Sequence, residues 1–190
     1  NTTFTFDDRD RKIGASGKLT VDELIALRSV GVTPQYINEM RALDLGDVPL
    51  EQIIAMRVQG VTPQYIRELR DAGVNIKDAG AVVALAVQGA SAEYVRGMRD
   101  AGIDVTRTGD LIAMRVQGVS PAYVRELRDA GYDKLAPKDL VSLRVQGVSA
   151  KFIRSLNDAG YRNLTVDELI RLAVSGIDAD YIRELSKYRQ

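Results

Sequence analysis

Arginine and glutamine recur along the chain at a fixed spacing, and these two residue types could bind a partner. One row of arginines comprises Arg28, Arg57, Arg115 and Arg144. A row of glutamines comprises Gln59, Gln88, Gln117 and Gln146, of which Gln59, Gln117 and Gln146 each follow an arginine of the first row by two positions. Guanidinium groups pair with carboxylates and phosphates, and a glutamine amide can both donate and accept hydrogen bonds. We therefore interpret these eight residues as candidate partner-binding residues.

The arginine row also has a structural interpretation. An arginine near the C-terminal end of a helix is favoured by the helix dipole, which is worth less than about 1 kcal/mol for an exposed side chain. On that interpretation, replacing the arginines together would leave the melting temperature nearly unchanged. The dipole does not explain why Ala86 and Ala173 interrupt the row. Both interpretations therefore stay open.

Two further rows favour structural roles. Arg67, Arg96, Arg125, Arg154 and Arg183 form a second arginine row, and an aspartate follows each of the first four after four residues, which favours ion pairs along a helix. An aromatic row comprises Tyr36, Tyr65, Tyr94, Tyr123, Phe152 and Tyr181. Aromatic rows can cradle peptides or bases. These rings lie on an apolar stripe and Phe152 is tolerated, so we expect them to pack between repeats with each hydroxyl bonded at the edge.

The composition excludes several classes of catalysis. The chain has neither His nor Cys, which removes the usual catalytic triads and almost every zinc, copper or haem site. The acidic cluster at Asp7, Asp8 and Asp10 lacks the downstream Gly and Glu of a calcium loop. We find no paired catalytic carboxylates and no phosphate loop. The sequence therefore predicts a protein without catalytic activity, cofactor or metal.

All these rows belong to one tandem repeat of 29 residues. Its clearest marker is a glycine that recurs every 29 residues, at Gly31, Gly60, Gly89, Gly118, Gly147 and Gly176. Counting back from the last residue gives six units, at 17–45, 46–74, 75–103, 104–132, 133–161 and 162–190. Residues 1–16 lie outside the repeat, and we interpret them as an N-terminal cap or linker in which Thr2 to Phe6 could form a strand.

Each unit predicts two short helices. In the second unit, Leu50, Ile53 and Ile54 approximate one apolar stripe, and Ile66 and Leu69 belong to another. Before each second helix stands a residue that can cap the first turn, and a glycine after each first helix can end it. The capping residues are Thr33, Thr62, Ser91, Ser120, Ser149 and Asp178. A 29-residue unit cannot bury its own apolar face, so we predict an all-α solenoid of six two-helix repeats.

Charge and hydropathy limit the possible partners. Twenty-six basic residues balance twenty-six acidic ones, so no overall field attracts nucleic acid or an anionic membrane surface. No apolar run approaches the roughly 18 residues of a membrane-spanning helix, so we expect no membrane span. Because the chain begins at Asn1 without an initiator Met, we expect a processed or excised piece. We expect a scaffold that binds a protein or peptide; the alternative is a modular repeat that binds nucleic acid.

The repeat resembles known short helical repeats. The unit Leu-Thr-Val-Asp-Glu-Leu-Ile-Ala-Leu-Arg-Ser-Val-Gly-Val-Thr-Pro-Gln-Tyr-Ile, from Leu19 to Ile37, resembles repeats of bacterial proteins. Among these are regions appended to membrane-anchored metallopeptidase sensors of the BlaR1 type, and the resemblance covers residues 17–190. It implies a bacterial accessory or sensor module, in a periplasmic or other extracytoplasmic setting. The chain has no His-Glu-x-x-His motif and is therefore not the peptidase itself.

Overall fold

The computed structural model describes residues 19–188, which form twelve α-helices. The first helices of the six units are α1 (Val21–Ser29), α3 (Leu50–Val58), α5 (Ala79–Val87), α7 (Thr108–Val116), α9 (Pro137–Val145) and α11 (Val166–Val174). The second helices are α2 (Pro34–Arg41), α4 (Pro63–Asp71), α6 (Ala92–Asp100), α8 (Pro121–Asp129), α10 (Ala150–Asp158) and α12 (Ala179–Ser186). The predicted pair of helices in each unit is confirmed.

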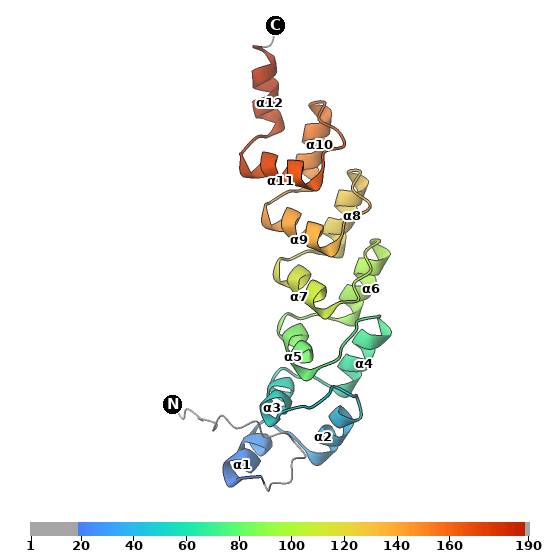
Figure 1. Ribbon diagram of the computed structural model, residues 1–190, viewed down its shortest axis with the longest axis vertical. Helices are drawn as coiled ribbons and strands as arrows, with labels where there is room; N and C mark the ends of the chain where they lie inside the picture. The colour runs from blue at the N-terminus through green and yellow to red at the C-terminus, as the bar shows by residue number, and fades with distance from the viewer. Residues whose placement is uncertain (1–18, 189–190) are drawn as a thin grey trace.

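The helices stack in two columns along an elongated body (Figure 1). First helices pack on the first helices of neighbouring units, as α3, α5, α7, α9 and α11 do in succession. Second helices pack in the same way, with α6 between α4 and α8, and α10 between α8 and α12. This array confirms the all-α solenoid that the 29-residue period predicts.

The second helix of every unit begins at the capping residue that the sequence predicts. In unit 2 the hydroxyl of Thr62 accepts a hydrogen bond of 3.1 Å from the backbone N–H of Tyr65, and Asp178 does the same for Tyr181 at 2.8 Å. Thr33, Ser91, Ser120 and Ser149 cap their helices with the same geometry. These side chains satisfy N–H groups that the helix itself leaves without partners.

Glycine ends the first helix because the backbone there turns into the left-handed region. Gly60 has a φ of 69°, and its N–H and that of Val61 bond to carbonyls of the last helical turn. A residue with a Cβ would be strained in this conformation. The recurring glycine is therefore required by the backbone, which explains why the repeat never loses it.

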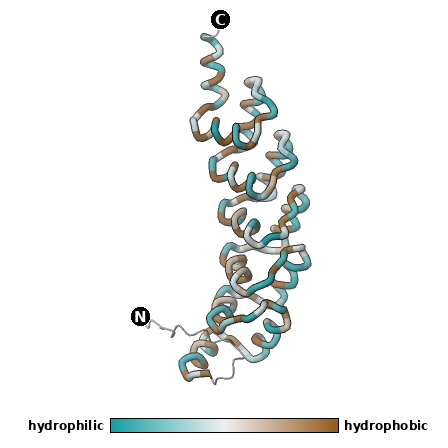
Figure 2. Tube along the Cα trace, in the orientation of Figure 1, coloured by the Kyte–Doolittle hydropathy of each residue, from teal (hydrophilic) through white to brown (hydrophobic). Residues whose placement is uncertain are grey.

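One apolar core runs through the array from Leu27 to Ile182. Leu69, Met98 and Leu127 occupy the same position of successive units, and each is completely buried. Hydrophobic residues are distributed along the whole array and do not gather in one part of it (Figure 2). Burial of one such side chain contributes roughly 1.5–3 kcal/mol, so the core between units holds the array together.

Two further sequence predictions concern the N-terminal residues and the absence of a membrane span. The N-terminal cap or linker at residues 1–16 lies outside the described residues. Among the helices between residues 19 and 188, none has the length and apolar character to cross a bilayer.

Candidate functional site

Tyrosines connect consecutive units through their hydroxyl groups. The hydroxyl of Tyr94 donates to the carbonyl of Val119 at 2.6 Å, and that of Tyr123 donates to Val148 at 2.7 Å. Tyr36 and Tyr65 make the equivalent bonds to the next unit, at 3.0 and 2.8 Å. The prediction that these rings pack between repeats with a bonded hydroxyl is thereby confirmed for four units. Burial raises the pKa of each of these four tyrosines to about 12.

Arginines of the first row lie over the tyrosine rings of the preceding unit. The guanidinium carbon of Arg57 is 5.3 Å from the ring centre of Tyr36, that of Arg115 is 4.8 Å from Tyr94, and Arg144 is 5.1 Å from Tyr123. Such a cation–π contact is worth about 0.5–1 kcal/mol at an exposed site. These arginines therefore contact their own array as well as solvent.

The same side chains satisfy carbonyl groups at the end of the preceding first helix. Nε of Arg57 donates to the Gly31 carbonyl at 3.2 Å, and Nε of Arg115 donates to the Gln88 carbonyl at 3.1 Å. The sequence suggested that the dipole of its own helix stabilises each arginine. The structure shows instead that Arg57 and Arg115 cap the helix one unit earlier, which only the packing of the units makes possible.

The interruption at Ala86 leaves one tyrosine without an arginine. Tyr65 is only half-buried, and within residues 19–188 no guanidinium lies over its ring. Beside Gly31, Arg57 Nη2 comes within 3.6 Å of the position that a Cβ would take, whereas nothing comes within 4 Å at Gly60. The end of α3 therefore has a gap in place of the arginine that lies beside Gly31 and Gly89.

Filling this gap should stabilise the protein. In the Ala86→Arg variant, the new guanidinium can stack on Tyr65 and donate to a carbonyl at the end of α3, as Arg115 does at α5. We expect the free energy of unfolding to rise by about 0.5–1.5 kcal/mol. Urea denaturation followed by circular dichroism measures this change. The control is Val87→Arg, which adds the same side chain at the neighbouring exposed position of α5, and a gain there as large as that of Ala86→Arg would contradict stacking on Tyr65.

Removing the stacked arginines should destabilise the array. Replacing Arg57, Arg115 and Arg144 together by Ala removes three cation–π contacts and two bonds to helix-end carbonyls. We expect a loss of about 2–4 kcal/mol, where helix-end charge alone would predict almost none. Thermal and urea denaturation give the value. Arg28→Ala serves as the control, because Arg28 has no tyrosine beneath it among the described residues, and an equal loss per residue there would contradict stacking.

A further arginine row, which sequence reasoning missed, also joins the units. Arg70 donates to the Leu43 carbonyl at 2.6 Å and to the Ile76 carbonyl at 2.9 Å. Arg99 donates to the Ala72 carbonyl at 2.6 Å, and its other close contact is Asp104 at 3.5 Å. Their 29-residue spacing was the signal that could have identified them. They cap the second helix of the preceding unit, as Arg57 and Arg115 cap the first.

Where this row is broken, the surface is hollow. Asn157 occupies the position of Arg99 two units later and helps to line a hollow of about 480 Å³ at the end of α8. The other lining residues are Ala130, Gly131, Tyr132, Arg162, Asn163 and Leu164. An asparagine side chain is shorter than an arginine side chain and does not fill the space beside Ala130. The hollow lies where residues of units 4, 5 and 6 meet.

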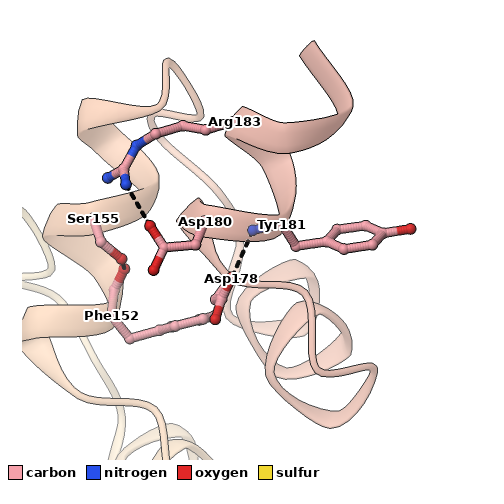
Figure 3. A network of polar contacts seen from close by, with 6 residues as sticks. All are labelled: Phe152, Ser155, Asp178, Asp180, Tyr181 and Arg183. Atoms are coloured by element: carbon pink, nitrogen blue, oxygen red, sulfur yellow. Dashed lines mark hydrogen bonds and ion pairs between the residues drawn. The ribbon is translucent and has the colours of Figure 1, made fainter. Parts of the chain in front are cut away.

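The second arginine row does not form the ion pairs that the sequence favoured. In the described part of the chain, Arg67 and Arg96 make no ion pair with the aspartates four residues later, and neither do Arg125 and Arg154. Both partners of each pair are exposed, where an ion pair gains little against the entropy of ordering two side chains. Arg183 does form an ion pair, with Asp180 in the same helix (Figure 3).

Five valines form an exposed row at the end of the first helices. Val58, Val87, Val116, Val145 and Val174 are each 52–65% exposed, and we call this row the valine edge. Gln59, Gln88, Gln117 and Gln146 follow these valines directly and are the C-terminal caps of their helices. Three of these glutamines are exposed and Gln88 is half-buried. The predicted glutamines therefore lie beside an apolar row that sequence reasoning did not single out.

The predicted arginines are placed differently from the glutamines. Arg28 and Arg144 are exposed, whereas Arg57 and Arg115 are half-buried against the preceding unit. Between residues 19 and 188 the structure brings together no three acidic, His or Cys side chains that could hold a metal ion. In the sequence, a glutamine follows four of these valines and an arginine precedes three of them, and these side chains bind by hydrogen bonds and charge.

Comparison with known proteins finds no family model, no curated protein and no solved structure that matches the chain. The fold and the contacts between units define the class of protein by themselves. The chain is a helical-repeat solenoid in which tyrosine and arginine side chains join consecutive units.

Proposed function

We propose that the chain is a non-catalytic scaffold that binds a protein or peptide along the valine edge. The observation that supports this proposal is that a valine is more than half exposed at one position of five successive units. Valine is a poorer helix former than Ala, Leu or Lys, so an exposed valine that makes no packing contact does not stabilise the end of a helix. Contact with a partner is a reason to keep an apolar residue there.

The residues beside the valines suit a polypeptide. The exposed amides of Gln59, Gln117 and Gln146 can donate to carbonyls of a partner and accept from its N–H groups. Arg28 and Arg144 can pair with acidic side chains at the edge. In this proposal the valines make apolar contacts with the partner, and the hydrogen bonds of the glutamines fix the direction and register of the bound polypeptide. The resemblance to bacterial repeats adds the proposal that the chain is an accessory or sensor module of an envelope protein.

A library of random peptides tests this proposal and requires no candidate partner. The full chain is immobilised, peptides displayed on phage are selected on it, and an enriched peptide is measured by fluorescence anisotropy. We expect Val116→Asp to weaken binding at least about tenfold, because it puts a charge into an apolar contact. The matched control is Ala122→Asp, a change at an exposed position of α8 in the same unit, which should bind as the wild type does.

Two results would contradict the proposed function. An enriched peptide that binds Val116→Asp and Ala122→Asp equally well would place the binding surface elsewhere. A turnover of common hydrolase substrates that disappears on replacing one carboxylate would make the chain an enzyme.

The alternative, binding of nucleic acid, has one observation in its favour. Arg67, Arg96, Arg125 and Arg154 are exposed and have no ion-pair partner in the described part of the chain. Against it, an aspartate follows one turn after each of them and the net charge is zero. A gel-shift assay with single- and double-stranded oligonucleotides distinguishes the classes, because binding to phosphates appears at low salt and weakens steeply as salt rises.

A further inference from the structure

The first unit carries core residues on a face that no other unit covers. Val21 is 71% exposed, Leu24 52% and Ile25 53%. Together with Arg28 and Ser29 they line a hollow of about 470 Å³. The residues at the position of Leu24 in the later units are Ile53, Val82, Leu111, Leu140 and Leu169, none of which is more than 1% exposed. Leu24 is thus a core residue without the neighbour that buries its equivalents.

The last unit has the complementary face. Leu185 is 53% exposed, whereas its equivalents Met40, Leu69, Met98, Leu127 and Leu156 are completely buried. Tyr181 is 50% exposed, and its side chain points away from Phe152 and from the ion pair of Asp180 and Arg183 (Figure 3). Its hydroxyl has no hydrogen-bond partner among the described residues. Unit 6 therefore presents the tyrosine half of a contact between units.

The polar contact between consecutive units joins an arginine to a tyrosine, and the exposed face of unit 1 carries the arginine while that of unit 6 carries the tyrosine. Arg28 is the arginine of unit 1 that corresponds to Arg57, and no described tyrosine lies beneath it. At the opposite end of the array, Tyr181 corresponds to Tyr36, over which Arg57 stacks. The end of α11, at Ser175 and Gly176, corresponds to the end of α1 that Arg57 caps.

We propose that unit 1 of one copy stacks on unit 6 of a second copy, so that the array continues from chain to chain. In this contact Arg28 lies over Tyr181 of the second copy and donates to a carbonyl at the end of its α11. The hydroxyl of Tyr181 donates to the carbonyl of Val32, as Tyr36 does to Val61 within the chain. Leu24 and Leu185 become buried in the shared core. We assign a second copy of the chain to each exposed face because the contact continues the interface already present between units.

This association joins the unit 1 face of one copy to the unit 6 face of another, and the resulting pair still has one free unit 1 face and one free unit 6 face. A contact of this kind does not close after two copies and adds further copies as the concentration rises. It differs from a symmetric dimer, in which one face pairs with itself. The proposed contact uses none of the valines or glutamines of the valine edge, and it shares only Arg28 with the proposed partner-binding surface.

Sedimentation velocity on the full chain tests the proposal. We expect the weight-average mass to rise above the 20.9 kDa of one chain with increasing concentration, without a plateau at two copies. Leu24→Arg blocks one end and Tyr181→Arg blocks the other, so each variant alone should stay at the mass of one chain. Both residues are at least half exposed, so neither change disturbs the core of its own chain.

An equimolar mixture of these two variants gives the sharpest result. Each variant retains the end that the other has lost, so the mixture should form a pair of chains and stop at twice the mass of one. Ala122→Arg is the matched control, because it adds the same charge at an exposed position in the middle of the array and should associate as the wild type does.

Three outcomes would overturn the proposal. The first is a wild type that stays monomeric up to its solubility limit. The second is a dimer that Leu24→Arg abolishes and Tyr181→Arg does not, since unit 1 would then pair with itself. The third is a mixture of the two variants that contains only single chains.

Discussion

Replacing Tyr94 by Ala is expected to lower the free energy of unfolding by about 3–5 kcal/mol. The ring is 9% exposed, its hydroxyl donates to the Val119 carbonyl at 2.6 Å, and Arg115 stacks on its face. The substitution removes these three contacts, which join units 3 and 4, and leaves a buried carbonyl without a donor. Because the site lies in the middle of the array, unfolding could separate into two transitions. Urea denaturation followed by circular dichroism gives both the value and the number of transitions.

Two control variants separate the contributions at this site. Tyr94→Phe keeps the ring and removes only the hydroxyl, so it should cost about 1–2 kcal/mol. Tyr181→Ala makes the same change at the same position of unit 6, where the ring is half exposed and joins no further unit of its own chain, so it should cost a single chain less than about 1 kcal/mol. Equal losses for Tyr94→Ala and Tyr181→Ala would show that the tyrosines do not hold the units together.

Alkaline solution is expected to unfold the array between about pH 10 and pH 12. Tyr36, Tyr65, Tyr94 and Tyr123 have a pKa of about 12 in the folded chain because burial disfavours the phenolate, against 10.0 for an exposed tyrosine. Below pH 10 these groups are protonated in both states and contribute no pH dependence. Above pH 10 the unfolded chain loses their protons first, so stability falls as pH rises towards the folded pKa.

The slope of this loss is at most about 1.4 kcal/mol per pH unit for each tyrosine, and four such groups act together. Thermal denaturation at a series of pH values from 8 to 12 measures it. A variant with Tyr94→Phe and Tyr123→Phe has two fewer of these groups, so its stability should fall less steeply over the same range. If the stability of the wild type and of the double variant fell equally steeply with pH, alkaline unfolding would be caused by other groups.

The repeat and its helices could be predicted from the sequence because local chemistry decides them. Thr62 caps α4 through the third N–H after it, and Gly60 ends α3 with a positive φ, each within a few residues of the chain. The 29-residue period then implies that every unit meets its neighbour in the same way. The core position of the tyrosine ring also followed from its apolar stripe.

The partners of the arginines could not be predicted in the same way. Arg57 and Asp71 both occur at regular spacing, and the sequence favoured a free helix-end charge for one and an ion pair with Arg67 for the other. The structure stacks Arg57 on Tyr36 and leaves Asp71 without its predicted ion pair. A long side chain reaches across to the next unit, and which atoms it meets there depends on how the units are packed.

The sequence by itself determined the two helices of each unit, their caps and the number of units, because these depend on contacts within a few residues and on a repeated pattern. Only the tertiary structure decided which polar groups join the units and which surfaces stay open. The valine edge shows the reason: Val58 has the same apolar character as Val61, yet it is 62% exposed and Val61 is 1% exposed. Hydropathy does not distinguish two valines three residues apart, whereas the stacking of the neighbouring unit covers one and leaves the other in solvent.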